Sequence, residues 1–193
     1  MANFTKQAIK ISFMKLLNEK PFNKISVRDI VEDCGINRNS FYYHFRDIPA
    51  LTEEIIMEET NRMLEKYPTL DSLHVFVDEI AKTCKENKRA LLHIFNSVSR
   101  DVYEEHVMRM CDEIVKKYAN TAFCYLPLDK NERRIGNDAV KCMLFGFSID
   151  WISNGLKEEY VKDLHAMCDL IYDFLRHMDN IKTDAEVPEK DNN

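Results

Sequence analysis

Hydrophobic residues recur along most of the chain with the three-to-four-residue spacing of amphipathic α-helices. In residues 5–18 the apolar side chains share one stripe and the lysines Lys6, Lys10 and Lys15 lie off it. Thr5 is the expected N-cap of this helix, and Pro21 follows its end. The same spacing predicts further helices over 71–86, 88–98, 101–119, 131–154 and 158–178. The pattern therefore predicts an all-α protein of about nine helices.

Two short helices with a turn between them are predicted near the N-terminus. Ser26 is placed to cap a helix that ends at Gly35, where a left-handed residue closes a helix C-terminus. Asn37 can cap the next helix, which runs from Arg38 to about His44. Two helices of this length, joined by about three residues, predict a helix-turn-helix.

The second of these short helices places aromatic and polar side chains on different sides. Phe41 and Phe45 lie four residues apart, so we expect them to anchor one face to a small core. Because Phe41, Tyr42 and Tyr43 span about 200° of the helix, they cannot all face that core. The other side chains can reach a phosphate or a base edge: Arg38, Asn39, Ser40, Tyr42, Tyr43 and His44. The alternative is an aromatic helix that only packs, with its tyrosines half-buried.

Composition supports a helical protein and narrows its function. The 193 residues include only 4 Gly and 5 Pro, too few for a many-stranded sheet, and no glycines are spaced to cradle a phosphate. The net charge is −6, yet residues 1–48 hold 8 basic and 5 acidic residues, a charge of +3, which leaves −9 for the rest. A basic end on an acidic body suits a DNA contact at that end, although so small an excess also arises by chance.

The six cysteines are scattered among apolar neighbours with no Cys-x-x-Cys pair. We expect buried free thiols in a reducing cytoplasm and no metal site. No motif for a nucleophile or a zinc-bound water occurs, so no catalytic residues and no cofactor are expected, and the protein is not predicted to be an enzyme. The longest apolar run, 143–152, contains Ser148 and Asp150 and is too short to cross a membrane.

The breaks between predicted helices divide the chain into three parts. Residues 1–48 are the expected helix-turn-helix DNA-binding domain. Residues 49–178 are the expected helical regulatory and dimerisation domain, in which 49–65 form a connecting helix capped by Asp47. Residues 179–193 hold almost no large apolar side chains, so we expect a disordered tail.

The stretch from Ser26 to Asp47, SVRDIVEDCGINRNSFYYHFRD, resembles the DNA-binding signature of the TetR family of bacterial regulators. The resemblance implies a three-helix DNA-binding head and a helical body that dimerises and often binds a small ligand. It implies base reading for Arg38, Asn39 and Ser40, and phosphate contacts for Tyr42 and His44. The full set of expected DNA-binding residues is Ser26, Arg28, Asn37, Arg38, Asn39, Ser40, Tyr42, Tyr43, His44 and Arg46.

Two positions depart from the family pattern. The family often has glycine where Asn39 stands, so the preferred base sequence cannot be transferred to this chain. A lysine that contacts phosphate commonly precedes the fourth helix, and here Ile48 occupies that place. We expect Arg46 to replace this contact.

The C-terminal region is expected to form a dimer. Residues 141–155 resemble the C-terminal module of a subgroup of the same family, and the predicted helix 158–178 has two apolar sides. One side can face its own body and the other a symmetry mate, in a four-helix interface. A monomeric bundle core is the alternative. The expected interface residues are Gly146, Leu164, Met167, Ile171, Phe174 and Met178.

Aromatic, methionine and histidine residues gather in the predicted helices between 71 and 119. They suit an adaptable pocket for a small apolar or aromatic effector, and they equally suit an ordinary core. The candidate pocket residues are Phe76, His93, Phe95, Tyr103, His106, Met110 and Tyr118.

Together these features predict a homodimeric transcriptional repressor that a small-molecule effector releases from a palindromic double-stranded DNA operator. One alternative is an activator or co-regulator controlled by a partner protein. A more distant alternative is a thiol redox sensor.

Overall fold

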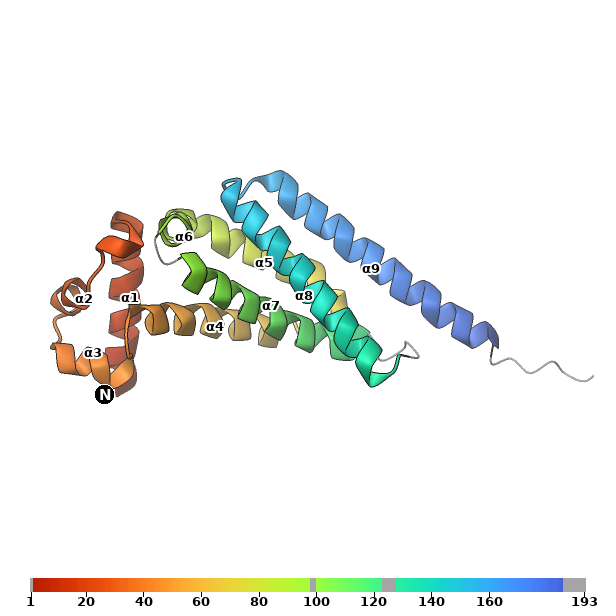
Figure 1. The fold of residues 1–193 in the computed structure, drawn as a ribbon, viewed down its shortest axis with the longest axis horizontal. Helices are drawn as coiled ribbons and strands as arrows, with labels where there is room; N and C mark the ends of the chain where they lie inside the picture. Colours follow the sequence, from red (N-terminus) through yellow and green to blue (C-terminus); the bar gives the residue numbers. More distant parts are fainter. Residues whose placement is uncertain (1, 98–99, 123–127, 186–193) are drawn as a thin grey trace, which may run out of the picture.

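The computed structural model describes residues 2–97, 100–122 and 128–185, and in these ranges it consists of nine α-helices and two 3₁₀ turns. The all-α prediction is confirmed. Figure 1 shows an elongated molecule with α1–α3 at one end and the C-terminal end of α9 at the other. The elements are α1 (Ala2–Glu19), η1 (Phe22–Lys24), α2 (Val27–Cys34), α3 (Arg38–His44), α4 (Ile48–Lys66), η2 (Leu70–Ser72), α5 (Leu73–Glu86), α6 (Lys88–Phe95), α7 (Arg100–Ala122), α8 (Lys130–Ser153) and α9 (Glu158–Ala185).

Side-chain caps set the ends of the two short helices, as the sequence predicts. The Ser26 hydroxyl accepts from the Asp29 N–H at 3.2 Å, and the Asp29 carboxylate accepts from the Ser26 N–H at 2.7 Å. Gly35, with a φ of 69°, ends α2 in the left-handed conformation that favours glycine. Asn37 then caps α3 by accepting from the Ser40 N–H at 2.8 Å. The helix-turn-helix therefore follows from local interactions.

The Asp29 cap makes part of the stability acid-sensitive. Hydrogen bonds from the Ser26 hydroxyl and backbone, with help from Lys20, lower the pKa of Asp29 from 3.8 to about 2. Because the folded pKa lies below the unfolded one, the cap stabilises the fold above pH 3.8, and this contribution is lost as the pH falls towards 2. In thermal unfolding, Asp29→Asn should lower Tm near neutral pH. The difference in Tm between wild type and variant should become smaller as the pH falls from 3.8 towards 2. A deficit that stays constant from pH 5 to pH 2 would contradict the assignment.

Charged and polar contacts attach the head, α1–α3, to the body, α4–α9. The Lys10 ammonium pairs with Glu54 and Glu58 of α4, each at 2.6 Å, and Lys6 pairs with Glu54 at 2.7 Å. From the body, the His93 ring donates Nδ1–H to the Leu17 carbonyl near the end of α1, at 2.7 Å. These contacts fix how α1 lies on α4 and α6.

Two predictions about the first helix are wrong. The helix begins at Ala2, so Thr5 lies inside it and is not its cap. Lys10 was expected off the apolar stripe, yet it is only 6 % exposed. The α4 carboxylates Glu54 and Glu58 explain this burial, since a paired ammonium can leave water whereas an unpaired one cannot.

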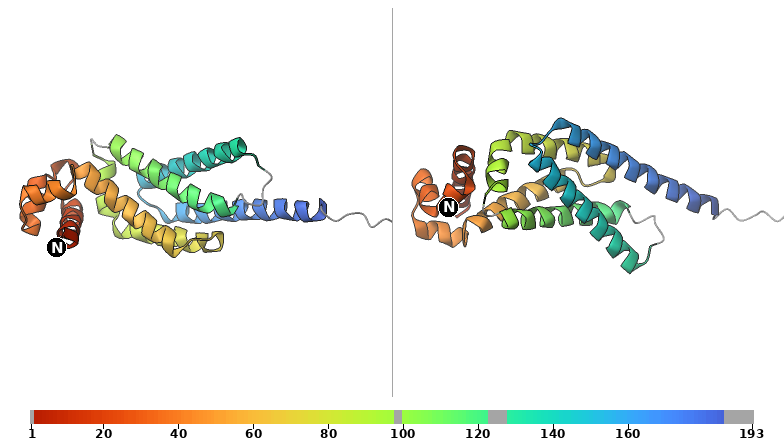
Figure 2. Two further views of the ribbon diagram at one scale, coloured as in Figure 1. Left: turned by 90° about the horizontal axis from the view of Figure 1, so that it is seen from below. Right: turned by 45° about the horizontal axis from the view of Figure 1, so that its top comes forward.

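The body buries its apolar side chains in two clusters. Most lie in a core shared with the head, and a smaller cluster contains Met63, Leu64, Phe76 and Tyr118. Figure 2 shows α7 alongside α4 and α8, with α9 extending beyond them. No helix in the described ranges has the length and apolarity needed to span a membrane.

The last helix is longer than predicted. It continues to Ala185, so residues 179–185 are helical and not part of a disordered tail. The physical reason is that no proline or glycine interrupts the chain before Pro188, and a helix continues at small cost where nothing breaks it. The rest of the predicted tail, 186–193, lies outside the described residues.

Candidate nucleic-acid interface

Two buried phenyl rings hold α3 against the head. Phe41 is 0 % and Phe45 3 % exposed, and their ring centroids lie 5.9 Å apart. They pack in the same core as Ile30 of α2 and Leu51 of α4. The four-residue spacing of the two phenylalanines thus defines the inner side of the helix, as expected from the sequence.

The other side of α3 faces solvent. Tyr42 is 56 % and Tyr43 79 % exposed, Arg38 and Asn39 are also exposed, and His44 is half-buried. The tyrosines are therefore not the half-buried packing residues of the alternative interpretation. Figures 1 and 2 show α3 at the end of the molecule that is remote from α8 and α9.

Neighbouring rings orient these exposed side chains. Tyr42 lies edge-on to Phe41, with centroids 5.5 Å apart, and Tyr43 lies edge-on to His44 at 4.9 Å. Edge-to-face pairs of this kind are favourable by about 0.5–1.5 kcal/mol beyond the area they bury. The phenol groups of Tyr42 and Tyr43 therefore reach solvent while each ring keeps an aromatic neighbour.

Several predicted DNA-binding residues already have partners within the head. The side chains of Ser26 and Asn37 cap α2 and α3, and the Ser40 hydroxyl donates to Asn37 at 3.1 Å. Arg28 pairs with Glu32 at 2.6 Å across one helical turn. A phosphate or base contact by these residues has to share or replace the existing interactions.

Ile48 occupies the position where the family commonly has a phosphate-contacting lysine, and Arg46 lies close to it in the chain. Ile48 is partly buried and packs against the main core, so it presents no group to a phosphate. Arg46, with 85 % of its side chain exposed, pairs with Asp47 at 2.9 Å. An exposed pair of this kind contributes little stability, so the guanidinium can exchange Asp47 for a phosphate.

The predicted effector-pocket residues lie in different parts of the core. Phe76 and Tyr118 pack together in the smaller cluster, with centroids 5.5 Å apart, whereas Phe95 and Tyr103 pack in the main core at 6.3 Å. Met110 is partly buried against the main core, and His93 is bonded to the Leu17 carbonyl. The structure therefore distributes most of this set between two cores.

His106 differs from the rest of that set. It is 4 % exposed, and neither ring nitrogen has a hydrogen-bond partner in the described residues. Burial lowers the pKa of His106, opposed by Glu53 of α4, whose carboxylate lies 3.9 Å away. A buried imidazole with a lowered pKa thus lies at the contact between α7 and α4.

Two surface cavities lie elsewhere. One, of about 430 Å³, runs along α4 and is lined by Glu54, Met57, Glu58, Asn61, Arg62 and Glu65. The other, of about 250 Å³, lies between the η2–α5 segment and α9 and is lined by Leu70, Asp71, Leu73, His74, Cys168, Asp169 and Tyr172. Neither cavity is lined by a predicted pocket residue.

An apolar stripe on α8 was not among the predicted interface residues, apart from Gly146. Its members recur at helical spacing and are exposed in the single chain: Ile135, Ala139, Cys142, Met143 and Gly146. A Cβ added at Gly146 would meet no atom within 4 Å, so no other segment of the same chain lies close to this position. The four-residue and three-residue spacing from Ile135 onward is the sequence signal that could have identified the stripe.

The predicted interface residues on α9 are only partly described. Leu164 is partly buried against the main core, and Met167 is also partly buried. Leu170, which was not predicted, is 71 % exposed. The side chains of Ile171, Phe174 and Met178 lie outside the described residues.

The cysteines bear on the alternative of a redox sensor. Burial raises the pKa of Cys84 to about 12 and the pKa of Cys111 and of Cys168 to about 11, which keeps these thiols protonated and slow to react. Cys142 is exposed, so the prediction of a buried thiol is wrong there, because this position belongs to the stripe on α8. Cys124 lies outside the described residues.

Comparison with known proteins agrees with this arrangement. Residues 14–55 match the profile of bacterial regulatory proteins of the TetR family, and residues 71–173 match a transcriptional regulator C-terminal region. No curated protein sequence matches the chain.

Several solved structures share the fold. The dihydroxyacetone kinase operon activator DhaS superposes with a TM-score of 0.58 at 18 % identity, covering 92 % of this chain and 97 % of DhaS. NalD, the secondary repressor of the MexAB-OprM multidrug efflux pump in Pseudomonas aeruginosa, gives 0.57 at 19 % identity, covering 88 % and 96 %. The fatty acid degradation regulator FadR from Bacillus halodurans gives 0.54 at 13 % identity, covering 89 % and 94 %.

The buried and exposed sides of α3 and the two matched regions lead to one conclusion. The chain belongs to the TetR family of bacterial regulatory proteins and is a DNA-binding helix-turn-helix regulator of transcription.

Proposed function

We propose that this protein is a homodimeric repressor that binds a palindromic operator and that a small-molecule effector releases it. The observation that carries the proposal is the exposed side of α3, where Arg38, Asn39, Tyr42 and Tyr43 stand on a helix anchored by buried rings. A helix of this kind fits the major groove, where side chains read base edges.

The stripe on α8 supports the dimer. A row of exposed apolar side chains, Ile135 to Gly146, would otherwise remain in water, and a two-fold axis lets the same row cover itself. Pairing of two chains places two α3 helices on one duplex. Two half-sites about one helical turn apart, roughly 34–36 Å, then give the affinity that one short helix lacks.

His106 supports an effector that acts through α4. Its two buried ring nitrogens can bond a polar group of a ligand, and Glu53 and Arg109, which form an ion pair, connect α7 to α4 beside it. A ligand that separates α7 from α4 moves α4, the helix that directly follows α3 in the chain. The two heads then no longer match neighbouring major grooves.

The second candidate is an activator or co-regulator controlled by a partner protein. It is favoured by the distribution of most of the predicted pocket residues between two cores, where they pack against other side chains. The similar structure of DhaS, an operon activator, is consistent with it at the level of the fold.

Selection of bound fragments from a genomic DNA pool tests the proposal. The full chain should enrich a palindrome with half-sites about one helical turn apart. Met143→Glu should abolish the dimer in sedimentation analysis and weaken operator binding, because it places a charge in the centre of the stripe. Lys130→Glu, which adds the same carboxylate on the opposite side of α8, is the matched control and should remain dimeric.

Two results would overturn the proposal. Enrichment of a single unrepeated site, or of no site, excludes the palindromic operator. A Met143→Glu protein that stays dimeric and binds as well as Lys130→Glu excludes the stripe as the dimer interface.

A further inference from the structure

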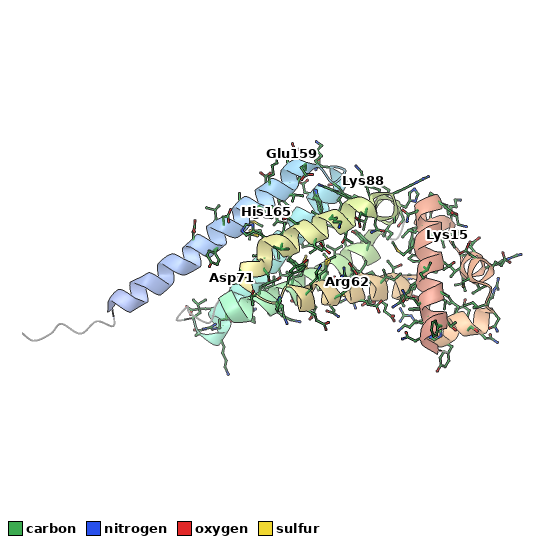
Figure 3. The ribbon with its side chains drawn as sticks, turned by 180° about the vertical axis from the view of Figure 1, so that it is seen from behind. Lys15, Arg62, Asp71, Lys88, Glu159 and His165 are labelled. Carbon is green, nitrogen blue, oxygen red and sulfur yellow. The ribbon has the colours of Figure 1, made fainter. Side chains whose placement is uncertain are left out.

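Helices α5 and α9 lie antiparallel and are joined by a row of polar contacts. Lys85 pairs with Glu158 at one end, and Tyr172 donates to Asp71 at 3.4 Å at the other. Between them lie two histidines, His74 of α5 and His165 of α9. Figure 3 shows His165 and Asp71 at the contact between these segments. None of these contacts lies in the DNA-binding head, α1–α3.

The two histidines face each other edge to edge. Their Nδ1 atoms are 2.6 Å apart, the ring planes differ by 3°, and the centroids are 4.9 Å apart. Each ring is held from behind by a carboxylate of the opposite helix. His165 Nε2 lies 2.8 Å from Asp78, and His74 Nε2 lies 2.9 Å from Asp169.

Counting protons shows what this geometry requires. A carboxylate only accepts hydrogen bonds, so both Nε2 atoms carry a proton. The contact between the Nδ1 atoms needs one further proton and no second one, because two lone pairs repel each other and so do two N–H groups. The pair therefore holds three protons, which makes one ring an imidazole and the other an imidazolium.

A metal ion does not fit between these rings. Histidine nitrogens bind a tetrahedral Zn²⁺ at about 2.0–2.1 Å, so two nitrogens on one ion stand about 3.3 Å apart. The observed 2.6 Å matches a hydrogen bond. Within the described ranges, no three His, Cys, Asp or Glu side chains converge as metal ligands.

We propose that His74 and His165 share one proton, and that this proton-bound pair is a pH-sensitive clasp that holds α9 against α5. Adding a second proton places two N–H groups in opposition, and removing the shared proton leaves two opposed lone pairs. The clasp therefore closes at intermediate pH and opens on both sides.

Charged and titratable groups of the neighbouring segments surround the pair. Asp78 faces the pair from α5 and Asp71 lies beside it on η2, while Asp169, Cys168 and Tyr172 lie on α9. Tyr118 of α7 lies near Cys168. The Asp78 and Asp169 carboxylates each accept a hydrogen bond from one Nε2–H. They do not remove the steric and electrostatic conflict that a second proton creates between the Nδ1 atoms.

The clasp acts on a helix that is proposed to contact a second chain. Leu170, 71 % exposed, lies on α9 next to Asp169. Opening the clasp would free this part of α9 from α5. This consequence rests on the proposed dimer, whereas the shared proton itself does not.

A double-mutant cycle in the full chain tests the clasp. His74→Gln, His165→Gln and the double variant each keep a side-chain amide that can donate to the facing Asp, but they cannot share a proton. Thermal unfolding of the wild type and the three variants, from about pH 5 to about pH 9, gives the coupling between the two positions, which is the departure of the double variant from the sum of the single effects. The coupling should pass through a maximum and fall on both sides, and hydrogen exchange at the start of α9 should be slowest at that maximum.

His93→Gln is the matched control. His93 donates one Nδ1–H to the Leu17 carbonyl, a bond that protonation of the ring leaves intact. The effect of His93→Gln on stability should therefore not fall as the pH is lowered, unlike the coupling between His74 and His165. In proton NMR, the wild type should show one strongly downfield signal that each single variant at the pair lacks and that His93→Gln retains.

Each contrary result overturns the proposal. A coupling that is absent, or that changes in one direction only across the pH range, excludes a single shared proton. Stabilisation by added Zn²⁺ that depends on both histidines would assign the pair to a metal. Because these measurements use no DNA, failure of the clasp is distinguishable from failure of operator binding.

Discussion

Replacing Phe41 with alanine is expected to destabilise the protein by about 3–5 kcal/mol and to abolish DNA binding. Phe41 is fully buried between α3 and the rest of the head, where its ring contacts those of Tyr42 and Phe45. The cavity left by the ring cannot close easily, because Asn37 caps the start of α3 and Asp47 caps the start of α4, on either side of Phe41. Chemical denaturation, followed by circular dichroism, measures the loss.

Tyr43→Ala is the control for this variant. It removes a ring of similar size from the same helix, but Tyr43 is 79 % exposed, so its stability effect should stay within about 0.5 kcal/mol. Tyr43→Ala should therefore stay folded while affecting DNA binding. Equal destabilisation by the two substitutions would mean that α3 is not anchored through Phe41.

Substitutions on the exposed side of α3 are expected to divide into two kinds. Arg38→Ala and Asn39→Ala should change which bases are selected, at a cost of about 1–3 kcal/mol for each lost base contact, or about 5-fold to 150-fold in affinity. Tyr42→Phe and His44→Ala should weaken binding to all DNA alike, since phosphate contacts carry no base information.

Binding to the selected operator and to unrelated DNA, measured at one salt concentration, separates these two kinds. Tyr160→Phe is the matched control, because its hydroxyl donates to Asp150 on the body, far from the head. It should leave affinity for both DNAs unchanged. If Tyr42→Phe and His44→Ala behave like this control, the exposed side of α3 does not contact the phosphates.

The head could be predicted almost residue by residue. Ser26, Gly35 and Asn37 act through neighbours within four residues, so their effects follow from the sequence order itself. The spacing of Phe41 and Phe45 likewise defines an inner side without knowledge of the partner helices. The start of α1 was missed because no strong cap precedes it and Thr5 offers a false one.

Features that depend on distant segments could not be predicted. The burial of Lys10 requires two carboxylates that lie more than forty residues away, and the role of His93 requires the end of α1. The clasp depends on His74 and His165, which only the antiparallel contact of α5 and α9 brings together. Neither histidine has a distinctive neighbour in the sequence.

The amino-acid sequence by itself determined that the protein is helical, where its helix-turn-helix begins and ends, and which side of α3 faces outward. These properties depend on helical periodicity, capping and turn residues, all of which act over a few positions. Only the tertiary structure decided which charges are buried, that most of the predicted pocket residues fall into two cores, and that α9 is held by paired imidazoles. The reason is that pairing between helices depends on their relative placement, which the whole core sets and no local pattern encodes.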